Sequence, residues 1–237
     1  MRTVHVTPPL PPDDLERLRA RWDALCIRVG AFASSADADL TFEMIHGLYE
    51  SPPRAYHNLG HVDQCLRAFD SVRRLADDAD AVEMALVLHD CVFAATREDN
   101  EQQSAFVAQA ISGLIGAPAD FVRRVHEHIM ATRHDERPLT GDDALTADVD
   151  LSILAADADE YATYRAAIRD EFGFADDDLF NRGRLAFVNR QLARKHIFST
   201  PYFRSELERA ARANLTRERD DLEDRLHTQP PHFRKTD

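Results

Sequence analysis

The chain has 237 residues, enough for one large domain with a sizeable hydrophobic core. Hydrophobic residues make up 44% of it and charged residues 30%, which is the balance of a soluble globular protein. The formal net charge of −13 argues against non-specific nucleic-acid binding but leaves room for a local basic pocket. No apolar run approaches the ~18 residues that a membrane span requires, and the N-terminus lacks a signal-peptide pattern. We therefore expect a cytoplasmic protein with neither a nucleic-acid nor a membrane partner.

Periodic apolar residues predict helices along most of the chain. Glycine is scarce, with 8 residues, whereas strong helix formers such as Ala, Leu, Arg and Glu are plentiful. No alternating strand pattern of useful length and no internal repeat is present. The sequence therefore predicts an all-α fold, a bundle of roughly ten helices. The predicted helices are a first one from Pro12 to about Gly30, then 42–49, 61–75, 81–94, 104–114, 120–131, 147–154, 161–172, 181–193 and 203–226.

The segment 84–93 places a histidine and an aspartate side by side in the middle of an apolar run. Burying His89 and Asp90 is costly unless the pair is hydrogen-bonded or bound to a cation. A satisfied pair at a helix end is the commoner explanation of such a dipeptide. However, a carboxylate beside an imidazole also suits a divalent metal of borderline hardness, so the interpretation depends on what accompanies the pair.

Further candidate ligands lie on other predicted helices. His61 lies upstream, with His57 four residues before it on the same side of a helix. Asp148 and Asp150 lie downstream, between apolar residues. Helical bundles build metal sites from side chains on facing helices. A metal site is therefore predicted from these segments, with either or both aspartates pointing inward.

The order of these residues resembles the HD-domain superfamily of metal-dependent phosphohydrolases, and more narrowly a bacterial group of predicted metal-dependent HD phosphohydrolases. The resemblance runs from about Arg54 to Leu215. Its motifs are Arg54-x-Tyr56-His57-Asn58-x-x-His61, Leu88-His89-Asp90-x-Val92-Phe93, Asp99-Asn100-Glu101-x-x-Ser104-Ala105, Asp148-x-Asp150-Leu151-x-Ile153-Leu154, Gly183-Arg184, Ile197-Phe198-x-Thr200 and Ala211-Arg212-x-Asn214-Leu215.

The resemblance implies that His61, His89, Asp90 and Asp150 bind a divalent metal ion. We prefer Asp150 to Asp148 because it directly precedes Leu151, as in the family. These mixed nitrogen and oxygen ligands suit Mn, Fe, Co, Zn, Ni or Mg, and the absence of a thiolate ligand argues against a structural zinc. The three cysteines are far apart and predict small core residues in a reducing compartment.

The resemblance also implies one HD-type domain over residues 1–237. Its metal-binding core covers roughly 42–155, with further helices at both ends of the chain. The expected activity is hydrolysis of a phosphate ester of a nucleotide or another small phosphorylated metabolite. A bound divalent ion lowers the pKa of a coordinated water toward about 7. Asp90 is the residue expected to contact both metal and water, and Glu101 or Asp99 is a candidate second acid.

His57 and three other polar residues are candidates for contact with the substrate. His57 is either a catalytic donor, an auxiliary ligand or part of a turn that caps the helix. Arg54 and Arg184 could hold a phosphate through their planar guanidinium groups; their alternatives are a surface charge and a solvated helix face. Asn58 is a substrate-binding candidate whose alternative is an ordinary N-cap.

Other functions remain open at this stage. The same scaffold could be a non-catalytic regulatory module that binds a metal or a nucleotide. A second metal could bind His126, His128 and His134, although the segment around His134 is typical of a solvated loop. With two irons the protein could be an oxygenase. The long charged helix 203–226 offers a surface for a homodimer.

Overall fold

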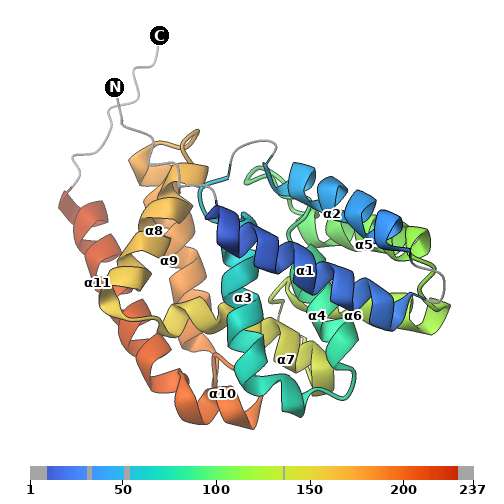
Figure 1. The fold of residues 1–237 in the computed structure, drawn as a ribbon. Helices are drawn as coiled ribbons and strands as arrows, with labels where there is room; N and C mark the ends of the chain where they lie inside the picture. The colour runs from blue at the N-terminus through green and yellow to red at the C-terminus, as the bar shows by residue number, and fades with distance from the viewer. Residues whose placement is uncertain (1–9, 31–33, 51–53, 136, 229–237) are drawn as a thin grey trace.

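The computed structural model describes residues 10–30, 34–50, 54–135 and 137–228, and within them it contains eleven α-helices and no strand (Figure 1). The all-α prediction is confirmed. No helix in these ranges combines the length and apolarity that crossing a bilayer demands. The helices are α1 (Pro12–Val29), α2 (Ser35–Glu50), α3 (Leu59–Val72), α4 (Ala79–Leu88), α5 (Asn100–Leu114), α6 (Ala119–Ala131), α7 (Gly141–Asp150), α8 (Ala158–Glu171), α9 (Asp177–Ala193), α10 (Pro201–Glu206) and α11 (Glu208–Thr228), with 3₁₀ segments η1 (Arg73–Leu75) and η2 (Leu151–Ala155).

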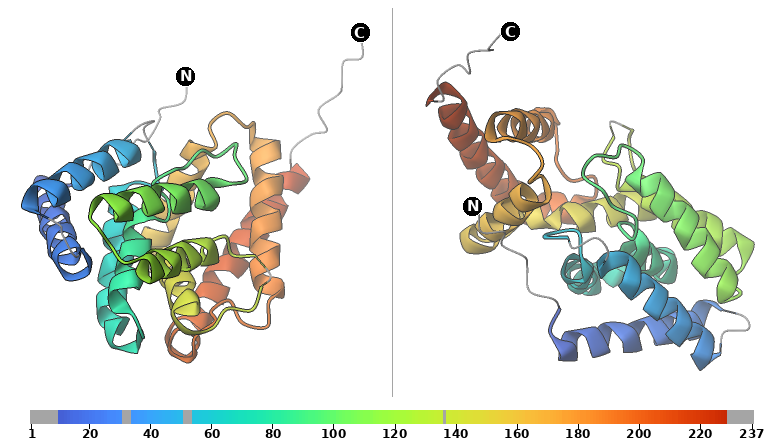
Figure 2. Two further views of the ribbon diagram at one scale, coloured as in Figure 1. Left: turned by 90° about the vertical axis from the view of Figure 1, so that its right-hand side faces the viewer. Right: turned by 90° about the horizontal axis from the view of Figure 1, so that it is seen from above.

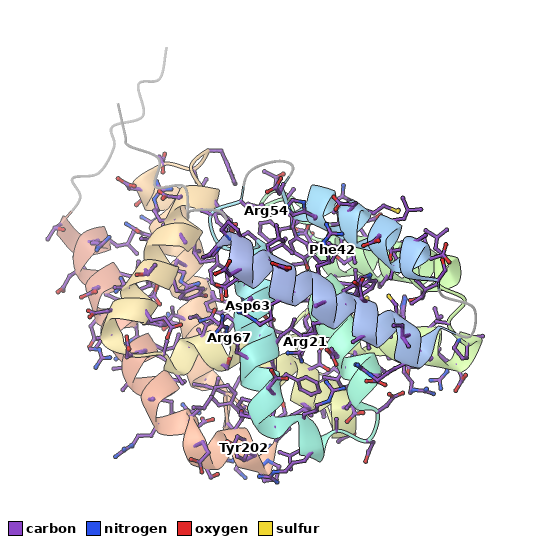
Figure 3. The ribbon with its side chains drawn as sticks, in the orientation of Figure 1. Arg21, Phe42, Arg54, Asp63, Arg67 and Tyr202 are labelled. Atoms are coloured by element: carbon purple, nitrogen blue, oxygen red, sulfur yellow. The ribbon has the colours of Figure 1, made fainter. Side chains whose placement is uncertain are left out.

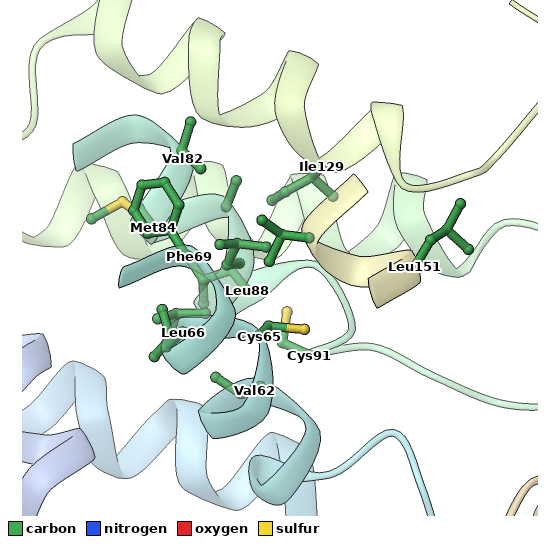
Figure 4. Close-up of a cluster of buried hydrophobic side chains, with 14 of the residues drawn as sticks. Val62, Cys65, Leu66, Phe69, Val82, Met84, Leu88, Cys91, Ile129 and Leu151 are labelled. Carbon is green, nitrogen blue, oxygen red and sulfur yellow. The ribbon is translucent and has the colours of Figure 1, made fainter. Parts of the chain in front are cut away.

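Helix α4 lies at the centre of the molecule. Every residue from Ala81 to Leu88 is buried, and the helix contacts α1, α3, α5, α6 and α7. A helix buried on all sides, as α4 is apart from its first turn, is stable only when neighbours surround it. Figure 4 shows Met84 and Leu88 of α4 among side chains of α3 and α6, including Phe69 and Ile129. Because the end of α4 lies deep in the fold, the residues that follow it are delivered to the interior.

The helix carrying the His–Asp pair is shorter than the predicted 81–94, since α4 ends at Leu88. Tertiary contacts explain the difference. The Arg54 guanidinium donates to the carbonyls of Asp90 and Cys91, which a longer helix would use for its own hydrogen bonds. The Asn100 side chain accepts from the backbone N–H of Ala94 and donates to its carbonyl. These contacts hold the segment after α4 as a loop.

Helix α1 is attached to α3 and α4 by ion pairs above its buried apolar face. Glu83 of α4 is buried and accepts from Arg21 at 2.5 Å and from Arg28 at 3.0 Å. Asp63 of α3 accepts from Arg17 of α1 at 2.8 Å. Figure 3 shows Arg21, Asp63 and Arg67 where α1 crosses α3. The N-terminal helices thus cover the central helix from one side and leave its C-terminal end free for the site.

The C-terminal helices form a second wall, in which α11 contacts α9 and η2 (Figure 2). The predicted helix 203–226 is two helices, α10 and α11, separated at Leu207. The linker before α10 explains the break, because the Glu208 carboxylate accepts the backbone N–H groups of Ile197 and Phe198. Thr200 then caps α10. This wall brings α8 and the start of η2 beside the N-terminal end of α3.

Candidate metal site

Three segments bring ligand atoms to one point inside the bundle. His61 comes from the first turn of α3, His89 and Asp90 from the turn after α4, and Asp150 is the last residue of α7. The Nε2 atom of His61 lies 3.2 Å from Nε2 of His89 and 3.0 Å from Oδ1 of Asp150. The Oδ2 atom of Asp90 lies 3.0 Å from Nε2 of His89 and 3.7 Å from Nε2 of His61. We call these four residues the His/Asp cluster.

The spacing of these atoms fits a bound cation. Ligands about 2.0–2.2 Å from a single ion lie about 3.0–3.5 Å from one another in octahedral or tetrahedral arrangements. The distances from imidazole to imidazole and from imidazole to carboxylate within the cluster span 3.0–3.7 Å. His61, His89 and Asp150, together with Cys65, form a buried group that could hold a metal ion. The presence of a divalent-cation site is therefore supported by the chemistry and the convergence of its donors.

The hydrogen bonds of His89 and the cap of α3 prepare both imidazoles for this role. Nδ1–H of His89 donates to the carbonyl of Leu86 at 2.9 Å, which leaves the Nε2 lone pair for the cluster. Oδ1 of Asn58 accepts from the N–H groups of Gly60 and His61 and so fixes the first turn of α3. A Cβ at residue 60 would lie 2.9 Å from that oxygen, which explains the glycine.

Asp148 and Asp150 separate clearly in the structure. The carboxylate of Asp148 accepts the backbone N–H groups of Ser199 and Thr200, each at 2.7 Å, and holds the linker before α10. Asp150 lies in the cluster. Residues two apart on a helix do not share a face, so only one of the two aspartates can point to His61 and His89. The preference for Asp150 agrees with this arrangement, although α7 ends at this residue instead of beginning near it.

His134 joins the site from the loop after α6. Its Nε2 lies 2.7 Å from Oδ2 of Asp150, on the carboxylate oxygen that does not face His61. Its φ of 51° lies in the left-handed region, which is sparsely populated for residues other than glycine. From the sequence, His134 was expected in a solvated loop or in a second metal site. The contact with Asp150 was not predicted, because no apolar residues around His134 indicate that it is partly buried.

Cys65 lies beside His61, one helical turn further along α3. Its Sγ is 3.6 Å from Nε2 and 3.7 Å from Nδ1 of His61. Nearly equal distances to both ring nitrogens place the sulfur away from the direction of the Nε2 lone pair. Burial, with the negative charges of Asp150 and Asp90, raises the pKa of the Cys65 thiol well above its usual value. The sulfur would therefore reach an ion at Nε2 only after its side chain turned.

The electrostatics of the cluster favour a cation. Burial alone lowers the pKa of His89, but Asp90 and Asp150 outweigh it and raise this pKa well above 6.5. Burial raises the pKa of Asp150, but the contacts with His134, His61 and His89 have the larger effect. The pKa of Asp150 therefore lies well below its usual value. The pKa of Asp90 is also lowered, because His89 and His57 outweigh its burial. A proton on His89 thus supplies the positive charge that a metal ion would bring.

Solvent reaches the residues around the cluster more than its imidazoles. His61 and His89 are almost fully buried, with side chains 2% and 1% exposed. The side chains of Asp150, His134 and His57 are 15%, 17% and 20% exposed. We call the partly exposed surface formed by these three side chains the open side of the cluster, where a ligand could approach.

Two further predicted residues border the cluster. The Nδ1 atom of His57 lies 2.6 Å from Oε2 of Glu171, and the ring stacks on Phe93 with centroids 3.9 Å apart. Glu101 stands in the first turn of α5. Burial raises the pKa of Glu101, and the negative charge of Asp90 raises it further. The structure thus brings His57 and Glu101 close to the predicted ligands.

The structure places the three predicted substrate-binding residues in internal contacts. Buried Arg54 donates to backbone carbonyls at the end of α2, before α3 and after α4. Oδ1 of Asn58 accepts the N–H groups at the start of α3, as expected of the N-cap alternative. Its Nδ2 donates to the carbonyls of Arg54 and Ala55. Arg184 is buried against Glu218 and Tyr164. These internal contacts engage most of their polar groups, although Nε of Arg54 is buried without a hydrogen-bond partner among the described residues.

A second metal group does not form in the part of the chain that the structure describes. In these described residues, one group of three or more His, Cys, Asp or Glu side chains brings its ligand atoms close together, and it is the group that contains His61. His128 pairs with Asp143 at 2.7 Å, and His126 lies near the ring of Phe106. The histidines of the two-metal alternative are therefore used separately.

The open side of the cluster and its neighbours define what the site could do. It combines a cation position, a carboxylate with a raised pKa at Glu101, and an imidazole at His57. Comparisons with protein-family models, with curated proteins and with solved structures found no match to this chain.

Proposed function

We propose that this protein is a metal-dependent phosphohydrolase of the HD type, acting on a nucleotide or another small phosphorylated metabolite. The observation that carries the proposal is the convergence of His61, His89, Asp90 and Asp150, with donor atoms 3.0–3.7 Å apart. The order of these residues along the chain, and the motifs around them, resemble the HD-domain superfamily. The resemblance supports the reaction class, and the geometry supports the cation.

The four cluster residues would hold the metal ion. A divalent ion of borderline hardness supplies Lewis acidity toward a phosphoryl oxygen and toward a water molecule. Two of the ligands are oriented by hydrogen bonds to their other polar atoms. Nδ1 of His89 bonds to the carbonyl of Leu86, and Oδ2 of Asp150 bonds to His134. The chain therefore provides both the ligands and the contacts that fix them.

The acidic neighbours of the cluster would handle the proton of the attacking water. A general base works best when its pKa lies near the working pH. Burial and Asp90 raise the pKa of Glu101, which moves this carboxylate in that direction. Asp90 has a lowered pKa and stays ionised, as expected of a ligand. We assign proton acceptance to Glu101 and ligation to Asp90.

The direct test compares metal-stripped protein with protein reloaded with Mn, Fe, Co, Ni, Zn or Mg. Phosphate release is measured from nucleoside mono-, di- and triphosphates, cyclic nucleotides and sugar phosphates. We expect turnover only after reloading, and a loss of kcat/KM of at least about a thousandfold in Asp150→Asn. Glu101→Gln should lose about a hundredfold or more without losing the metal.

The matched control is Asp148→Asn, which makes the same chemical change two residues away on α7. The Asp148 carboxylate holds the linker before α10, so its variant should keep the metal and the activity. Hydrolysis that is equal in wild type and Asp150→Asn would refute the proposal. Phosphate or nucleotide binding with no turnover under any ion would also refute it, in favour of a regulatory module.

A further inference from the structure

A buried carboxylate from the C-terminal wall makes three contacts with the turn before α3. Glu171 is the last residue of α8, and its side chain is 4% exposed. Its Oε1 accepts the backbone N–H groups of Tyr56 and His57 at 2.8 and 2.9 Å. Its Oε2 lies 2.6 Å from Nδ1 of His57. One carboxylate thus fixes both the backbone and the ring of a residue 114 positions earlier in the chain.

These contacts determine the direction of the His57 ring. Phe93 stacks on one face at 3.9 Å with an interplanar angle of 22°, and Tyr56 packs edge-on at 5.0 Å. The two nitrogens of an imidazole point to different sides of the ring, so Nε2 faces away from Glu171. No residue that the structure describes donates to Nε2 of His57 or accepts from it. The side chain is 20% exposed, and its ring lies 6.0 Å from the ring of His61 in the His/Asp cluster.

A phosphorylated ligand at the cluster would need a donor at this place. Asp90 and Asp150 carry negative charge and repel a phosphate, whereas the nearby guanidinium groups of Arg54 and Arg184 are engaged by backbone carbonyls and by Glu218. The imidazole of His57 is one polar group that the fold orients there. With Nδ1–H donated to the Glu171 carboxylate, Nε2 carries a second proton in the imidazolium form that this carboxylate favours. A hydrogen bond from an imidazolium to a phosphate is charge-assisted and therefore among the stronger ones.

We propose that Glu171 is a positioning residue, which holds the His57 imidazole so that Nε2–H contacts the phosphoryl group of a ligand at the His/Asp cluster. This inference rests on the proposed function and adds to it a specific contact and the residue that sets it. Glu171 touches neither the ligand nor the cluster, and it acts through His57.

The test is a double-mutant cycle on the metal-loaded protein, with inorganic phosphate as the probe. In Glu171→Gln the amide oxygen can still accept the N–H groups of Tyr56 and His57, but the carboxylate beside Nδ1 is lost. We expect His57→Ala and Glu171→Gln each to weaken phosphate binding about tenfold. The double variant should bind phosphate as His57→Ala does, because Glu171 acts through that ring. Metal affinity should stay unchanged in all three variants.

A second readout follows the ring directly. The ¹⁵N chemical shift of His57 Nε2 should move when phosphate is added to the wild type and move less in Glu171→Gln. Glu160→Gln makes the same change on α8, where Glu160 pairs with Gln64 on the exposed surface, and it should behave as wild type. If Glu171 had a purely structural role, phosphate would move the Nε2 shift as far in Glu171→Gln as in the wild type.

Three results would overturn the inference: normal phosphate binding by Glu171→Gln, additive losses in the double variant, or no phosphate binding by the loaded wild type. Metal affinity that falls with His57→Ala would also overturn it, by making His57 a metal ligand. Hydrolysis by the wild type without coupling of the two residues would overturn this inference alone. Coupling without any hydrolysis would overturn only the proposed function.

Discussion

Two buried polar clusters of this protein differ in where their balancing charge comes from. In the C-terminal wall, Arg184 of α9 donates to Glu218 of α11 at 2.9 Å and to the hydroxyl of Tyr164 at 3.1 Å. The hydroxyl of Tyr161 donates to the same carboxylate at 2.5 Å. We call these four residues the arginine network. Its positive and negative groups meet inside the protein, and it needs nothing from outside.

The His/Asp cluster is not balanced in this way. Two carboxylates face two imidazoles, and the positive charge there comes from protons bound to the imidazoles. Asp90 and Asp150 favour this protonation because they raise the pKa of His89. Buried charges are tolerated when they are paired or coordinate a metal. The comparison indicates that the arginine network serves the fold, whereas the His/Asp cluster could hold a cation from outside the chain.

The largest expected effect is the loss of stability when the arginine network is broken. Glu218→Ala leaves the buried Arg184 without its counter-charge, and removing one partner of a buried pair costs about 3–5 kcal/mol of unfolding free energy. Urea denaturation measures this loss. Arg182→Ala, which breaks an exposed pair with Asp178, should cost about 1 kcal/mol or less. If the comparison is correct, metal affinity does not change in either variant, and a change in Glu218→Ala would contradict it.

The next effect tests the cluster by adding a metal ion. A metal ion that binds only the folded protein should stabilise it by about 2.7 kcal/mol at a free concentration of 100 times its Kd. The same denaturation experiment, with and without the ion, measures the increment. Glu218→Ala should gain as much as wild type, because its cluster is intact. An increment that persists in Asp150→Asn would place the ion elsewhere.

A smaller effect concerns the residue behind Asp150. His134→Ala removes the contact to Oδ2 and should weaken metal binding about 10–100-fold, as is typical of groups that orient a ligand. Isothermal titration calorimetry with the metal measures it. His128→Ala is the matched control, because it removes a similar contact, with Asp143, outside the cluster. Equal affinities for the two variants would exclude this role of His134.

The smallest effect is a dependence on pH. Although burial lowers the pKa of His89, its acidic neighbours raise it above 6.5, so in the metal-free protein this proton stabilises the fold below pH 6.5. That stability is lost as pH rises through the folded-state pKa. Metal must displace the proton, so its affinity should rise by up to about tenfold per pH unit below that pKa. Titrations in buffers of different ionisation enthalpy detect the released proton, and a flat profile would contradict this account.

The sequence allowed much of the cluster to be predicted but little of its surroundings. His61, His89 and Asp150 are ligand-type residues within apolar helical patterns, which marks them as buried and polar at once. His134 and Glu171 carry no such mark. Their partners lie 16 and 114 positions away, so only the tertiary fold shows what they contact.

The helices follow the same division. Apolar periodicity predicted an all-α fold, because helix faces are written into local sequence. The end of α4 was wrong by several residues, because Arg54 and Asn100 set it through contacts with the loop that follows. Arg54 itself could be interpreted as a phosphate ligand or a surface charge, and neither interpretation anticipates a buried guanidinium that ties backbone carbonyls together. Capping by distant side chains is not visible in local patterns.

The central claim is that the His/Asp cluster binds one divalent ion per chain. Calorimetric titration of metal-stripped protein with Mn²⁺ or Zn²⁺ tests it most directly, in wild type and in Asp150→Asn with matched circular dichroism. We predict saturation at about one equivalent in the wild type and an affinity lower by at least about 100-fold in the variant. The absence of saturable binding, or equal affinity in the two proteins, would contradict it.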